Sequence, residues 1–380
     1  MSLLGIVSIL VGLLSAKFAM VERSRLRVFT FAALYVAHLV ASFVYFGYVQ
    51  AEGGDSELYY YDELDFYNRA FGLGTGTLIY FVQYLKGLIG GTYLDYFMMF
   101  HAIGFCGVAL LMRVFEEIYV GLRTEQQPFV LLLLLLPSLQ FWTCAIGKDA
   151  PLFLAACLSL WAMINVRKRW MAMGGAVLLM LLVRPHIALI ALVAVAVAML
   201  LEKQFSKLVR TGLLIVALVA VAFVITTIQS AYRLDLTDAD SVSTFIEARD
   251  TVAQSAAGGN TSVQGSFAVR MISLLFRPFF FDVEEMFGYI ASVENAFLML
   301  IFATIFARIP TVIALFRRSA FIRYAMTFTL GVAIVLALSY YNVGLGLRQR
   351  TMFLPGLLAL FVTILAIRAE RREDLRPVPA

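Results

Sequence analysis

The sequence predicts an all-α integral membrane protein, a polytopic transmembrane helical bundle of about 11 spans. Hydrophobic residues make up 62% of its 380 residues and charged residues only 14%, whereas a soluble domain is about half apolar and about a quarter charged. Apolar stretches long enough to cross a bilayer recur along the chain, with short polar loops between them. We therefore expect one integral-membrane domain over residues 1–380.

The predicted spans follow the chain from its first residues to its last helix. Only Arg184 and Pro185 separate two of the shorter segments, 170–183 and 186–201, so this pair can also form a hairpin or a re-entrant loop. The two longest loops cover residues 49–91 and 230–288. The eleven segments are 2–20, 28–48, 92–115, 128–145, 150–166, 170–183, 186–201, 211–229, 289–307, 321–341 and 351–367.

The basic residues predict how the chain is oriented. Lysine and arginine gather in alternate short loops, as in Arg167-Lys168-Arg169, and such loops face the cytoplasm. This places the N-terminus outside, the C-terminus inside, and both long loops outside. Residues 1–20 lack a basic leading region, so we expect no cleavable signal peptide. The net charge of +5 is then a signal of membrane topology, which excludes a nucleic-acid-binding patch.

The first outer loop carries an unusual acidic-tyrosine stretch, residues 54–67. Carboxylates at a bilayer edge are costly to desolvate and often functional. We interpret Asp55 and Asp62 as candidate general bases. The same carboxylates can instead hold a divalent cation, or form a solvated loop that merely obeys topology. Tyr60 and Tyr61, with Trp142 of the second outer loop, can stack on a sugar or form an aromatic belt.

Several cations lie on the predicted outer side, where the positive-inside rule disfavours them. Each has a simpler explanation. Lys148 precedes an aspartate that can cap a helix, Arg184 can extend to the interface, and Arg277 can be an interfacial anchor. Topology does not explain Arg348 and Arg350. A bound anion explains the whole set, which comprises Lys148, Arg184, His186, Arg277, Arg348 and Arg350.

The remaining ionisable residues point to no cofactor. The three cysteines lie in apolar segments without Cys-x-x-Cys or Cys/His clusters, so neither a metal site nor a disulfide is expected. His38 and His101 are interpreted as polar residues that find partners within the bundle.

An anion cradle opposite a carboxylate has the parts needed to transfer a sugar from a polyprenyl phosphate or diphosphate. Guanidinium groups stabilise the charge that grows on the leaving phosphate, and a carboxylate accepts the proton of the attacking hydroxyl. No Gly-rich nucleotide loop is present, and this chemistry needs none.

At these residues the chain resembles two kinds of bacterial membrane protein, the polytopic GT-C-type glycosyltransferases and the Wzy-like surface-polysaccharide polymerases. The resemblance implies an inner-membrane enzyme of exopolysaccharide or O-antigen assembly, with an acidic base in the first outer loop and arginines that grip the donor phosphate. Its partners would be a polyprenyl-linked sugar or oligosaccharide, membrane lipid and other assembly proteins. The short matching pieces are Gly54-Asp55 with the tyrosines after it, 142–149, 184–186, 277–279 with Glu294, and 342–350.

Three other functions stay open. A flippase or transporter of lipid-linked oligosaccharide would show mid-membrane charges and internal repeats, and the sequence shows neither. A non-catalytic subunit of an assembly complex would tolerate loss of the outer carboxylates. A sugar acyltransferase would need a buried catalytic histidine, for which His101 is the one deep candidate.

Overall fold

The computed structural model describes residues 2–20, 24–61, 72–118, 127–202, 206–232, 244, 263, 265–340 and 342–374. These residues form helices joined by turns, as the sequence predicts. They divide into two compact units, one made of residues 1–188 and 355–380 and the other of residues 189–354. The boundary falls within helix α12 (Pro185–Leu200) and at the start of α20 (Leu354–Asp374). Whether these units make one functional domain stays a prediction.

Four of the described helices are long and apolar enough to cross a membrane: α3 (Arg25–Glu52), α7 (Tyr93–Ile118), α16 (Met286–Phe306) and α18 (Ala320–Ser339). A fifth span results if Val343–Met352 and Leu354–Ile367, which meet at a 60° bend, count as one. These helices confirm predicted spans 28–48, 92–115, 289–307 and 321–341. The count of eleven spans is not confirmed, because four or at most five spans among the described residues meet the length and hydropathy of a membrane span.

The predicted span 128–145 is wrong as a single helix. Its residues form α8 (Gln127–Leu132), a 3-10 turn at Leu133–Leu135, and α9 (Pro137–Phe141), followed by turns up to α10 (Asp149–Ile164). Leu136 adopts extended backbone angles, φ −51° and ψ 126°, because a proline disfavours the helical conformation in the residue before it. The segment therefore consists of short helical pieces.

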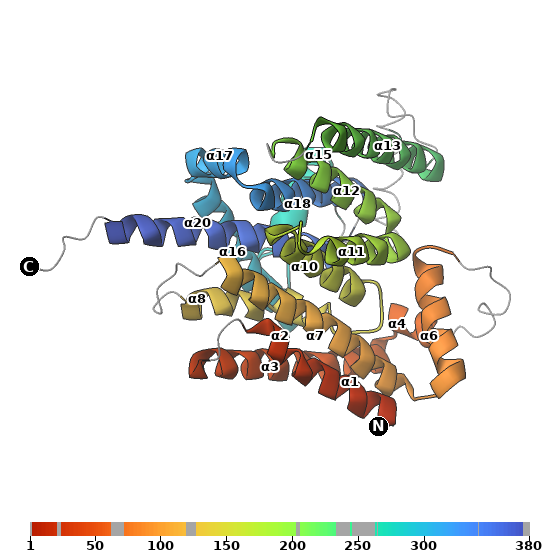
Figure 1. Cartoon of the computed structure of the whole chain (residues 1–380). Coiled ribbons are helices and arrows are strands. Elements are labelled where there is room, and N and C mark those ends of the chain that lie inside the picture. The colour runs from red at the N-terminus through yellow and green to blue at the C-terminus, as the bar shows by residue number, and fades with distance from the viewer. Residues whose placement is uncertain are drawn as a thin grey trace, which may run out of the picture. The chain divides into compact units, whose positions relative to one another are not determined.

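In the first unit, α7 is the central helix (Figure 1). It packs against α1 (Leu3–Leu14), α2 (Ala16–Ala19) and α3 on one side and against α10 on another, and α10 in turn packs on α11 (Trp170–Val183). Small residues allow this close approach. A Cβ on Gly107 would lie 2.6 Å from the ring of Phe153, so glycine lets α7 touch α10.

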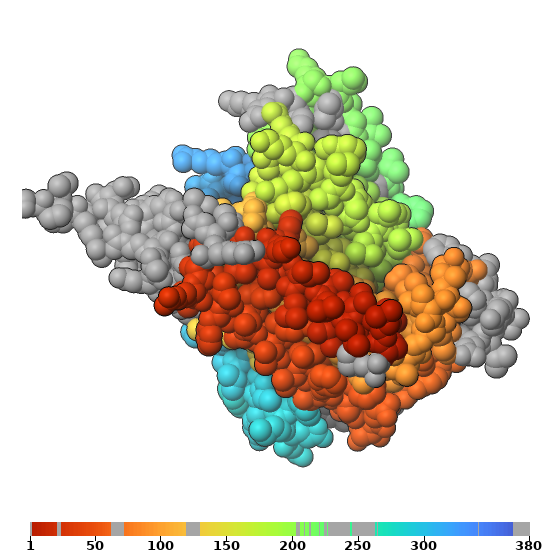
Figure 2. Space-filling model, turned by 60° about the horizontal axis from the view of Figure 1, so that its bottom comes forward, coloured from red at the N-terminus to blue at the C-terminus, as the bar shows by residue number. Residues whose placement is uncertain are grey.

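The N-terminal helices present an apolar outer face, visible in red in Figure 2. Leu3, Leu10, Phe29, Val36 and Val40 are each more than half exposed. Large exposed apolar surfaces mark contact with lipid or with other proteins. This face is suited to contact lipid, which agrees with a membrane protein.

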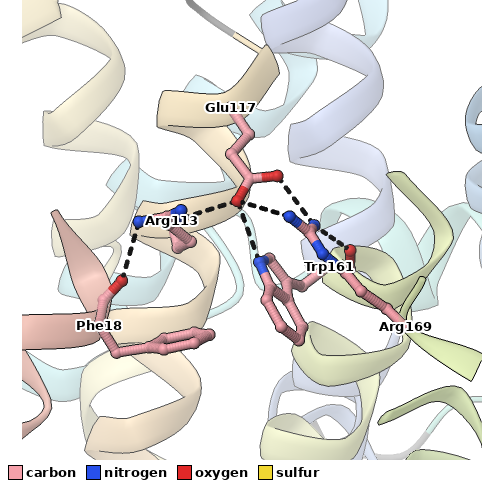
Figure 3. A network of polar contacts seen from close by, with 5 residues as sticks. All are labelled: Phe18, Arg113, Glu117, Trp161 and Arg169. Carbon is pink, nitrogen blue, oxygen red and sulfur yellow. Dashed lines mark hydrogen bonds and ion pairs between the residues drawn. The ribbon is translucent and has the colours of Figure 1, made fainter. Parts of the chain in front are cut away.

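A polar network joins three helices at the C-terminal end of α7 (Figure 3). Glu117 accepts hydrogen bonds from Arg113 at 2.7 Å, from the indole of Trp161 at 3.1 Å, and from Arg169 at 2.8 and 3.1 Å. Arg169 also lies over the ring of Trp161, 4.1 Å from its centroid. The network therefore ties α7 to α10 and to the start of α11.

The second unit contains α13 (Lys207–Tyr232), α15 (Phe267–Phe276), α16, α17 (Ile309–Arg318), α18, α19 (Val343–Gln349) and a 3-10 turn at Arg350–Met352. Arg323 of α18 is 1% exposed and donates to the carbonyls of Ala198, Phe316 and Arg317. It also forms an ion pair with Glu202. This fully bonded arginine joins α18 to α12 and α17.

Candidate anion-binding site

The second unit holds a buried arginine whose guanidinium is only partly bonded. Arg350 is 0% exposed. Its Nη1 donates to the side-chain oxygen of Asn295 at 2.6 Å and to the carbonyl of Leu275 at 2.9 Å. Its Nε and Nη2 are buried and have no hydrogen-bond partner among the described residues. One edge of the guanidinium is therefore fixed and the other is available.

Two parallel N–H groups on one guanidinium edge are the donor pair that binds a carboxylate or phosphate bidentately. The neighbouring Arg277 uses the same edge. Its Nε donates to Asp282 Oδ2 at 2.8 Å and its Nη2 to Oδ1 at 3.1 Å. An unpaired buried donor costs about 1–3 kcal/mol, and more when it is charged. The free edge of Arg350 thus indicates an oxyanion ligand.

Other residues in this unit form the surroundings of Arg350. Asn295 donates through Nδ2 to the carbonyl of Pro278 at 2.8 Å, so it links Arg350 to the turn that carries Arg277. Tyr340 donates its hydroxyl to the Arg270 carbonyl at 2.7 Å, and Nη1 of Arg270 donates to the Tyr340 carbonyl at 3.1 Å. All three arginines act electrostatically on Tyr340. Asp282 pairs with Arg277 and Glu294 acts on Arg350, so these two carboxylates offset part of the positive charge of the three arginines.

The structure adds residues that the sequence did not single out. Arg270, Asn295 and Tyr340 are buried and polar, yet each lies in an apolar stretch without a motif. Asn295 follows Glu294, which interacts electrostatically with Arg350. The pair Glu294-Asn295 inside an apolar span was the available signal, because buried polar residues in spans are costly and tend to be functional.

The predicted cations of this unit are brought together in part. Arg277 and Arg350 join the same cluster through Asn295. Arg348 lies on α19, half-buried, two residues before Arg350. Asn342 caps α19 by accepting the backbone N–H of Gly344 at 2.7 Å, so its position is explained by the helix start.

The first unit brings together the other predicted cations. Lys148 directly precedes α10, and Asp149 is its buried first residue. Arg184 ends α11 in an extended conformation, with Nη2 3.9 Å from Asp149 Oδ1. His186, in the first turn of α12, is acted on by the charges of both Arg184 and Lys148. A helix N-terminus with two cations beside it is suited to bind an anion.

The acidic-tyrosine stretch is only partly described. Asp55 is exposed at the start of α4 (Asp55–Tyr61), and Tyr61 is 57% exposed. Tyr60 is buried and donates its hydroxyl to the Gly91 carbonyl at 2.8 Å, so its ring offers no open stacking surface here. Asp62 lies outside the described residues. The roles of these residues stay predictions.

Trp142 and the two histidines also lie in the first unit. Trp142 packs edge-on against Tyr45 and Phe141 and is half-buried. His38 shares a 2.9 Å hydrogen bond with Gln140 and its ring centroid is 4.9 Å from that of His101. The expectation that both histidines find polar partners within the bundle stays a prediction.

The described residues contain no group of three or more His, Cys, Asp or Glu side chains placed to hold a metal ion. No protein-family model, curated protein or solved structure matches this chain. The site must therefore be interpreted from its own geometry.

Proposed function

We propose that the protein is a membrane glycosyltransferase, or a polysaccharide polymerase, that uses a polyprenyl-linked sugar phosphate or diphosphate as donor. It would act at the outer face of the bacterial inner membrane in exopolysaccharide or O-antigen assembly. The proposal includes eleven spans, with the N-terminus outside and the C-terminus inside. Its partners would be the lipid-linked donor, membrane lipid and other assembly proteins.

The observation that carries this proposal is the free Nε and Nη2 edge of Arg350. In a buried, low-dielectric site, preorganised donors stabilise charge that develops in the transition state far better than water does. A phosphate leaving group develops such charge. Arg270 contributes a further positive charge to the cluster, since it acts on Tyr340 together with Arg350.

The transfer step also needs a carboxylate that acts as a general base. The C1–O bond between sugar and phosphate breaks, a C1–O bond to the acceptor hydroxyl forms, and the acceptor proton passes to a carboxylate. Asp55, exposed at the start of α4, or Asp62 would be this base. Lys148 and Arg184 of the first unit, with His186 beside them, are proposed to contribute to phosphate binding.

The test replaces Arg350 by lysine, which keeps the charge and removes the bidentate edge. The matched control is Arg323→Lys, a change in an equally buried arginine whose three nitrogens all have partners. Polymer formation and binding of a polyprenyl phosphate are measured at equal levels of folded protein. We expect Arg350→Lys to lower both by roughly tenfold or more, since one such hydrogen-bonded charge pair is worth about 1.5–3 kcal/mol.

The control separates function from folding. Arg323→Lys should reduce thermal stability and leave lipid binding per folded molecule unchanged. Normal polymer and normal lipid binding by Arg350→Lys would contradict the proposal. Transport of the intact lipid-linked sugar without cleavage of its C1–O bond would support a flippase instead.

A further inference from the structure

We propose that Asp282 makes this site select a donor with one phosphate group over a diphosphate donor. This inference rests on the proposed function and concerns the same cluster. Arg277 and Arg350 of this cluster each have a guanidinium edge formed by Nε–H and Nη2–H. Asp282 occupies the edge of Arg277, so only that of Arg350 lacks a hydrogen-bond partner among the described residues.

The contacts show how firmly Asp282 holds its position. Both of its oxygens accept from Arg277, at 2.8 and 3.1 Å. Oδ2 also accepts the backbone N–H of Phe279 at 2.9 Å. Its side chain is 12% exposed. A ligand that takes the Arg277 edge must break the two hydrogen bonds from Arg277 and leave a partly buried carboxylate without its cation.

The two arginines belong to one continuous cluster. Asn295 bonds the carbonyl of Pro278, next to Arg277, and also bonds Arg350. The charges of both arginines act on Tyr340. A diphosphate has two groups that would each seek a bidentate partner here. With Asp282 in place, its second phosphate meets a resident anion, which repels it.

The unpaired edge of Arg350 provides donors for one phosphate group. Arg350 offers two N–H donors, Nε and Nη2, which match two oxygens of one phosphate group. When the C1–O bond of a sugar phosphodiester breaks, the lipid phosphate becomes a monoester and gains one negative charge. Arg350 stabilises that charge directly, and the acceptor proton leaves with the carboxylate base.

A purely structural role for Asp282 makes a different prediction. The Arg277–Asp282 pair closes the turn between α15 and α16, and its loss would lower stability. A structural role predicts equal effects on every ligand. Selectivity between one and two phosphate groups therefore distinguishes the two roles.

The experiment uses the full chain in lipid nanodiscs. It measures the affinities of a polyprenyl monophosphate and a polyprenyl diphosphate of equal chain length. Wild type should bind the monophosphate about tenfold tighter, a difference of roughly 1.4 kcal/mol. Asp282→Asn should raise diphosphate affinity about tenfold and change monophosphate affinity less than about twofold, since removing one repulsive charge is worth roughly that much. Glu285→Gln is the control, because it removes an exposed charge from the same turn.

Each outcome is decisive. Tighter binding of the diphosphate by wild type would overturn the inference, and so would an equal change for both lipids in Asp282→Asn. If that variant does not fold, the wild-type preference alone decides. Cleavage of a diphosphate donor that depends on Arg350 would leave the proposed function intact while refuting this inference. Failure of wild type to bind either lipid would refute the proposed function itself.

Discussion

Asn295 accepts a 2.6 Å hydrogen bond from Nη1 of Arg350. The two residues lie 55 positions apart in the chain and on different helical elements. The bond fixes one edge of the guanidinium, so the opposite edge has a defined direction. A change at Asn295 therefore tests whether donor binding depends on the orientation of the Arg350 guanidinium as well as on its charge.

Replacing Asn295 by leucine removes the bond to Arg350 and the bond to the Pro278 carbonyl. We expect Arg350 to lose its orientation, so the KM for the donor should rise roughly tenfold while kcat falls less, since charged hydrogen bonds are worth about 1.5–3 kcal/mol. Steady-state kinetics in membranes measure this. Ser292→Ala is the control, because Ser292 is buried on the same helix and its hydroxyl donates to the carbonyl of Gly288, one turn earlier on that helix. An unchanged KM would show that Asn295 does not position Arg350.

The cationic group of the first unit predicts a second effect on donor binding. Lys148→Gln removes a charge beside the start of α10 and near His186. Donor affinity should fall about fivefold to tenfold at low salt and less at high salt, because Lys148 is only half-buried and salt screens charges that solvent reaches. Lys168→Gln removes an exposed charge on the predicted inner side and should have no effect. Equal affinities in both variants would remove Lys148 from the site.

Gly104 of α7 allows no side chain. A Cβ there would lie 1.8 Å from the backbone oxygen of Thr143 and 3.2 Å from Nε2 of His38. Gly104→Ala should therefore destabilise the protein by about 3 kcal/mol or more, since overpacking a core costs roughly 1–3 kcal/mol even when side chains can move. Thermal unfolding in detergent measures it. At Gly174 of α11 no atom lies within 4 Å of a Cβ, so Gly174→Ala should be neutral or stabilising.

Glu117 holds together the network shown in Figure 3. Glu117→Gln leaves Arg113 and Arg169 without their shared anion. We expect the free energy of unfolding to fall by about 1.5–3 kcal/mol, the usual contribution of hydrogen bonds to charged groups. Donor affinity should not change, because the network lies in the first unit near none of the predicted phosphate-binding residues. Glu52→Gln, at an exposed position, is the control, and equal unfolding temperatures would contradict this role.

Asp282 predicts how stability depends on pH. Burial works to raise the pKa of this carboxyl, but the hydrogen bonds from Arg277 and Phe279 outweigh it, so the pKa lies below its ordinary value of 3.8. A depressed pKa gives stability that is present above the ordinary pKa and lost as pH falls through the folded value. Wild type should therefore be more stable than Asp282→Asn near pH 7, and the difference should shrink as the pH falls below 3.8 through the lower folded-state pKa. Thermal unfolding over this range checks it, and a constant difference would be evidence against the assignment.

Composition and hydropathy were sufficient to predict an all-helical membrane protein, because an apolar stretch in a bilayer must satisfy its backbone by forming a helix. They also placed α3, α7, α16 and α18. The prediction of a single span at residues 128–145 was wrong. Mean hydropathy does not register that Pro137 forces Leu136 out of the helical conformation.

Charge pattern likewise identified Arg277 and Arg350 as residues that topology does not explain. Only the tertiary structure decided how they differ: Asp282 pairs with one edge of Arg277, while Asn295 fixes Arg350 and leaves the equivalent edge open. The reason is physical. Residue type and hydropathy are local properties of the chain, whereas the hydrogen-bond partner of a guanidinium depends on which distant segments pack beside it.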